Sequence, residues 1–77
     1  MTVTVEYFRA MTDVNALWQR HGRDIDAVKG SPEYDAIVER LRSSGMNVTD
    51  VKVERIKYQF LEEPVDHYVE MVQFVVE

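Results

Sequence analysis

The C-terminal segment, residues 66–76, most constrains the fold because it is apolar on both sides. Its side chains alternate as those of a strand do, since successive residues of a strand point to opposite faces. Without a cover, a β-prone and weakly charged segment of this kind favours aggregation. We therefore expect the strand to be central in its sheet, with a second copy of the chain over its second face. One face carries Tyr68, Val72, Phe74 and Val76, and the other Val69, Met71 and Val75.

The chain offers little else to cover this strand. Its 77 residues predict a single domain, 1–77, and a domain of this size buries only about 60% of the surface that its unfolded chain exposes. There is no cysteine, which excludes disulfides and leaves a metal or a partner subunit as added sources of stability. The apolar fraction of 45% is nevertheless typical of a folded domain rather than a disordered one.

Residues 2–10 also alternate, with Val3, Val5 and Tyr7 on one side and Phe8 on the other. This period of two, in β-branched and aromatic residues, predicts a first strand. If that strand lies beside the C-terminal one, Phe8 joins the second apolar face.

Spacings of three and four then predict a helix that begins near Thr12 or Asp13 and ends at Lys29 and Gly30. Gly22 lies inside this pattern, and whether it breaks the helix stays open.

A second helix begins at Ser31-Pro32-Glu33, which combines an N-cap serine, a proline at the first helical position and an acidic first turn. Its apolar stripe consists of Tyr34, Ile37, Val38 and Leu41.

From Met46 onward the period returns to two. Val51 and Val53 lie on one face but Ile56 and Tyr58 on the other, so we expect a β-bulge near Glu54 or Arg55 that brings them to the same side. Residues 61–65 predict the turn of a long hairpin.

Together these elements predict an α+β domain of order β-α-α-β-β. A right-handed crossover gives a three-stranded sheet of order 1-3-2, with two helices packed on one face. The order and length resemble the dodecin flavin-storage proteins. Dodecins carry a flavin-stacking tryptophan at the entry to the second strand, where this chain has Met46-Asn47-Val48, so we expect no flavin and no other cofactor.

The net charge of −5 comes entirely from the last seventeen residues, which contain five acids and no Lys or Arg. Such an edge repels phosphate, so we expect no direct binding of nucleic acid, whereas a basic protein surface would be attracted. The acidic edge consists of Glu62, Glu63, Asp66 and Glu70.

No pattern in the chain predicts catalysis or a metal site. The three glycines are isolated, so there is no phosphate-binding loop, and on a strand His67 and Glu70 face opposite sides. No apolar run is long enough to cross a membrane, and the N-terminus lacks the layout of a signal peptide. We expect a cytoplasmic protein that is not an enzyme.

Three functions remain open. The first is a non-enzymatic protein-interaction module that forms a homo-oligomer, most simply a dimer, through the open sheet face. The alternative is a small acidic inhibitor, like phage-encoded antagonists or bacterial immunity proteins, that occupies a basic surface of its target through the acidic edge. A pocket for a small molecule, lined by Trp18, His21, Tyr34 and Tyr58, is the third. The self-association face consists of Phe8, Val69, Met71 and Val75.

Overall fold

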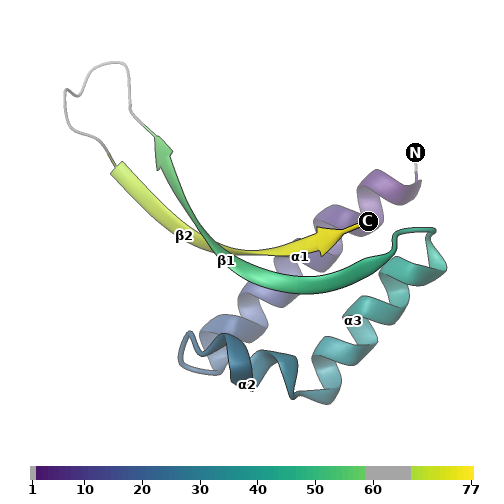
Figure 1. The fold of residues 1–77 in the computed structure, drawn as a ribbon, viewed down its shortest axis with the longest axis horizontal. Coiled ribbons are helices and arrows are strands. Elements are labelled where there is room, and N and C mark those ends of the chain that lie inside the picture. Colours follow the sequence, from purple (N-terminus) through teal and green to yellow (C-terminus); the bar gives the residue numbers. More distant parts are fainter. Residues whose placement is uncertain (1, 59–66) are drawn as a thin grey trace.

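The computed structural model describes residues 2–58 and 67–77, in which three helices precede an antiparallel hairpin (Figure 1). The predicted turn at 61–65 and three residues of the acidic edge, Glu62, Glu63 and Asp66, lie outside the described residues. The elements are α1 Thr2–Arg20, α2 Ile25–Lys29, α3 Pro32–Ser43, β1 Val48–Tyr58 and β2 His67–Val76.

The predicted first strand is wrong, because residues 2–10 form the first half of α1. The helical stripe extends N-terminally through Ala10 and Tyr7, and no glycine or proline separates this segment from the rest. Once a helix has formed, each further residue adds a hydrogen bond without a new nucleus, so the helix continues through β-branched residues. Thr12 therefore lies inside the helix, where its hydroxyl donates to the carbonyl of Phe8 at 3.0 Å instead of capping.

The chain breaks after α1, which resolves what the pattern around Gly22 left open. Gly22 and Arg23 both have positive φ angles, of 66° and 61°, a region that a continuing helix does not use. Asp24 then caps α2 by accepting from the backbone N–H groups of Asp26 and Ala27.

The predicted start of α3 is confirmed. The Ser31 hydroxyl accepts from the backbone N–H of Tyr34 at 3.3 Å, and Pro32 occupies the first helical position. Ile37, Val38 and Leu41 are buried.

The hairpin register is regular from Asp50 to Tyr58, so the bulge expected near Glu54 or Arg55 is wrong. The irregularity lies between Val48 and Asp50 instead, where Thr49 has no partner in the register and donates its hydroxyl to the carbonyl of Val75. Ile56 therefore stays on the face opposite Val51 and Val53.

The three-stranded sheet of order 1-3-2 is likewise wrong, because β1 and β2 alone form the sheet in the described part of the chain. Without an N-terminal strand, the likeness to dodecins has no basis, and β2 is not central.

The helices cover one face of the hairpin, α1 against β2 and α3 against β1. The core comprises Ala10, Val14, Leu17, Trp18, Val28, Ile37, Val38, Leu41, Val48, Val51, Val72 and Phe74.

Helix α1 takes the place that a third strand was expected to fill. The side-chain amide of Asn15 donates to the carbonyl of Val72 at 3.1 Å, and its oxygen accepts from the N–H of Val72 at 2.8 Å. A single side chain thus pairs with the β2 backbone as a neighbouring strand would. Tyr7 packs edge-on against Phe74 at 6.4 Å, so α1 runs antiparallel to β2.

The far end of the hairpin projects beyond the helices (Figure 1). The radius of gyration is 14.1 Å, whereas a compact chain of this length has about 11.5 Å. We call this end, residues 55–58 and 67–70, the arm.

Replacing Asn15 with alanine should destabilise the protein by about 1–3 kcal/mol, because the N–H and carbonyl of Val72 lose their partners. Urea unfolding measures the loss, and hydrogen exchange should show reduced protection of the Val72 amide. Thr12→Ala is the control, since it removes an exposed hydroxyl from the same helix and should change the free energy by less than about 0.5 kcal/mol. Equal, small effects of the two substitutions would contradict the assigned role of Asn15.

Candidate functional site

The candidate site is the sheet face that the helices leave uncovered. Because the buried residues Val51, Val72 and Phe74 face the helices, the residues between them in the register point away. We call this the outer face. It consists of Lys52, Glu54, Ile56 and Tyr58 on β1, and His67, Val69, Met71, Gln73 and Val75 on β2.

The β2 half of the outer face is the more apolar half. Val69 is 45% exposed, and Met71 and Val75 are half-buried. Ile56, which pairs with Val69 across the strands, extends the apolar area onto β1. Three of the four residues predicted for the self-association face therefore lie in one row.

Phe8, the fourth, lies on α1 rather than on a strand and is 67% exposed. It precedes Asn15 by seven residues, which is two helical turns or about 10 Å on the same side of the helix. Val75 lies about 10 Å along β2 from Val72, the partner of Asn15. Phe8 therefore lies on the side of α1 from which Asn15 reaches the edge of β2.

A pair of opposite charges interrupts the β1 half of the outer face. The ammonium of Lys52 lies 2.9 Å from the carboxylate of Glu54, with 53% and 41% of the two side chains exposed. Sequence analysis did not single out this pair, and the bulge that it expected near Glu54 or Arg55 also kept Ile56 off this face. The unbroken alternation from Asp50 to Tyr58 is the signal that places Lys52, Glu54 and Ile56 on one face.

Glu70 lies on the opposite, helix-side face of the arm. Its carboxylate is 3.4 Å from the guanidinium of Arg23, which also stacks on the Trp18 ring at 4.6 Å. Arg55, the cross-strand partner of Glu70, stacks on Tyr68 at 4.4 Å. Glu70 thus helps to join the arm to the helices.

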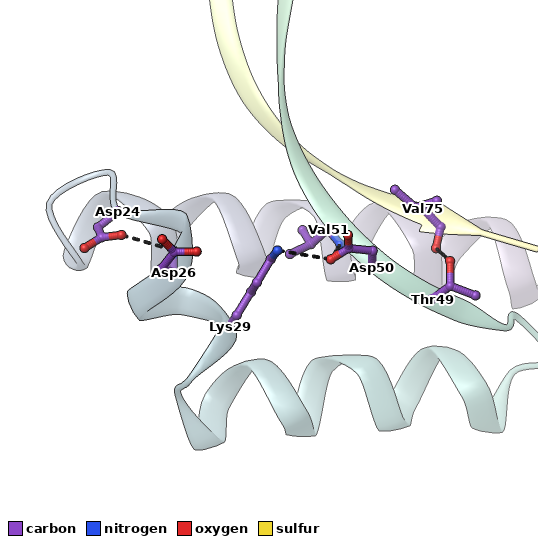
Figure 2. Close-up of polar contacts among 7 residues, drawn as sticks. All are labelled: Asp24, Asp26, Lys29, Thr49, Asp50, Val51 and Val75. Carbon is purple, nitrogen blue, oxygen red and sulfur yellow. Dashed lines mark hydrogen bonds and ion pairs between the residues drawn. The ribbon is translucent and has the colours of Figure 1, made fainter.

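A groove of about 430 Å³ separates α3 from β1. Two of its cations have partners on β1. The Lys29 ammonium lies 3.2 Å from the Asp50 carboxylate, as Figure 2 shows, and Arg42 donates to the carbonyl of Val48. The backbone N–H of Val51, and then Lys29, lower the pKa of Asp50. Burial, and then the Asp50 carboxylate, raise the pKa of Tyr34. The Lys29–Asp50 ion pair and the Arg42 hydrogen bond therefore connect α2 and α3 to β1 across this groove.

The pocket expected from Trp18, His21, Tyr34 and Tyr58 does not form. Trp18 is buried in the core, His21 is exposed after the end of α1, and Tyr58 lies on the arm. Only Tyr34 lines the groove. Within residues 2–58 and 67–77, no three acidic or histidine side chains come close enough together to hold a metal ion.

None of the helices in the described part of the chain combines the length and apolar character needed to cross a bilayer.

Comparisons with known protein families, with curated proteins and with solved structures gave no match. The described elements define a small α+β domain in which helices cover one face of a hairpin.

We expect Asp50→Asn to reduce the pH dependence of stability in acid. The folded-state pKa lies below the ordinary value of 3.8, so the carboxylate stabilises the fold above about pH 4, and this contribution disappears as the pH falls through the folded-state pKa. The difference in unfolding free energy between wild type and variant should therefore shrink from pH 7 to pH 2.5, as measured by urea unfolding. Lys29→Met keeps the bond from Val51 and should give a smaller change. A difference that stays constant with pH would contradict the assignment.

Proposed function

We propose that this protein is a non-enzymatic interaction module that self-associates, copy to copy, through the outer face. The observation that carries the proposal is the apolar row of Val69, Met71 and Val75 on a sheet face that the helices leave uncovered. A two-stranded hairpin is marginally stable unless it packs against other structure, and here the helices supply that packing on one side only.

The exposed surface of the chain supports this proposal. The accessible surface is 5435 Å², whereas a compact monomer of 9.0 kDa exposes about 4,900 Å². The excess of roughly 500 Å² is about two thirds of the roughly 800 Å² that one subunit contributes to an ordinary interface. Covering the outer face would remove apolar surface from water, which is the main driving force for association.

A second copy is the occupant that the charges favour. The outer face carries one cation and one anion, Lys52 and Glu54, so it has no net charge and repels no copy of itself. A strongly basic partner would find a single carboxylate there. Within the proposal the oligomer is a dimer, the simplest closed assembly for one self-complementary face.

The alternative, an acidic inhibitor of a basic protein, has no specific support from the described residues. Glu70 already contacts Arg23 and faces away from the apolar row. The other three acids of the predicted edge lie outside the described residues. That function, like the cytoplasmic location, stays a prediction from the sequence.

We expect Met71→Lys and Val75→Lys each to dissociate the dimer, since a buried, unpaired ammonium is costly at an apolar interface. Phe8→Lys should weaken it as well, because the proposal includes Phe8, a large apolar side chain that is 67% exposed on α1, in the covered surface. Sedimentation velocity over a range of concentrations measures the association, and circular dichroism establishes that each variant is folded.

Ala36→Lys is the matched control, because it adds the same charge at an exposed position of α3, away from the hairpin. It should leave the association unchanged. An undiminished oligomer with Met71→Lys and Val75→Lys would refute the proposed interface.

A further inference from the structure

The direction of the backbone polar groups of β1 follows from the contact between Asn15 and Val72. Because Asn15 meets both the N–H and the carbonyl of Val72, these groups point away from β1. Val53 is opposite Val72, and residues directly opposite each other in an antiparallel pair exchange either two hydrogen bonds or none. The N–H and carbonyl of Val53 therefore point away from β2. Alternation along the strand gives Val51 and Arg55 the same direction.

The start of this edge of β1 is closed. The backbone N–H of Val51 donates to the carboxylate of Asp50 at 2.8 Å, and the ammonium of Lys29 contacts the same carboxylate. The irregularity at Thr49 also interrupts the regular ladder there. Bulges and charged side chains are common devices that keep the edge of a sheet from pairing with another chain.

The same edge is open further along, at Val53 and Arg55. Within residues 2–58 and 67–77, no hydrogen bond reaches the outward N–H or carbonyl of either residue. Unpaired groups in a row of this kind form a template on which an extended peptide can add as a strand. The opposite edge of the sheet offers no such template at Val72, because Asn15 of α1 occupies it.

The charges along the open edge favour an acidic peptide. Residues 52–57 contain three bases and one acid, although the whole chain has a net charge of −5. The acid, Glu54, contacts Lys52, whereas Arg55 stacks on Tyr68 and forms no ion pair with another described residue. A second copy of β1 would bring the same bases to this edge. An acidic strand would instead place a carboxylate beside Arg55, and opposite charges on neighbouring strands attract.

We propose that the open edge of β1 binds an extended acidic peptide of a partner protein, which adds to the sheet as a third strand. Val53 and Arg55 exchange backbone hydrogen bonds with the peptide. On the helix side Arg55 attracts a carboxylate, and on the outer face Ile56 contacts an apolar side chain. Since successive residues of a strand face opposite sides, the bound segment alternates acidic and apolar residues. The site goes beyond the proposed function, because it uses the edge of the sheet rather than its outer face.

Binding of a synthetic peptide that alternates glutamate and valine tests this site. Fluorescence anisotropy of the labelled peptide gives its affinity for wild type, Arg55→Ala and Arg55→Pro, and circular dichroism establishes that each variant is folded. Arg55→Ala removes only the charge and should weaken binding by up to about fivefold. Arg55→Pro also replaces the outward N–H with a ring, which spares the hydrogen bonds to β2 but blocks strand addition. It should bind at least about tenfold more weakly than Arg55→Ala.

A peptide with lysine in place of glutamate is the matched control, and it should bind at least about tenfold more weakly than the acidic peptide. Hydrogen exchange locates the acidic peptide on the wild-type protein without any substitution. The peptide should slow exchange of the Val53 and Arg55 amides and leave the Val72 amide unchanged.

Three results would overturn the site: equal affinities of Arg55→Ala and Arg55→Pro, equal affinities of the acidic and basic peptides, or protection that appears away from β1. Failure of the acidic peptide to bind wild type would overturn it as well, even if the protein is a dimer. A monomeric wild type that binds the acidic peptide at Val53 and Arg55 would support this site and contradict the proposed function.

Discussion

The contact between Asn15 and the backbone of Val72 determines how the two parts of this small domain fit together. Because one side-chain amide meets both polar groups of Val72, helix α1 lies along the edge of β2. There it occupies the position that an additional strand would take. In the described residues the sheet therefore has two strands, and helices α1 and α3 both pack against the same face of it. The open outer face follows directly from this arrangement.

Local signals in the sequence predicted the parts of the fold that depend on local chemistry. Ser31 and Pro32 begin α3 because capping and a fixed φ act within one turn, and the sequence alone reveals both. Residues 2–10 show the opposite case. Their alternation fits a strand, yet the same residues continue the stripe that starts at Val14. The longer helix prevails because Tyr7 and Ala10 find partners in the core, which is a tertiary effect.

The site was predictable in part. Two-sided apolar alternation identified Val69, Met71 and Val75 as one row, since the side-chain period of a strand does not depend on its neighbours. The opposite strand was harder, because its facing residues depend on register, which a single bulge shifts by one position. The bulge lies at Thr49 rather than near Glu54, and this difference places Ile56 on the outer face beside Lys52 and Glu54.

The central claim is that a second copy covers the outer face, and the mass of the wild-type protein in solution tests it most directly. Size-exclusion chromatography with light scattering should give twice the chain mass of 9.0 kDa at both low and high salt. Salt screens exposed charges but does not weaken apolar burial, so a dimer held by the apolar row persists in both conditions. A mass of 9.0 kDa at every concentration would contradict the account.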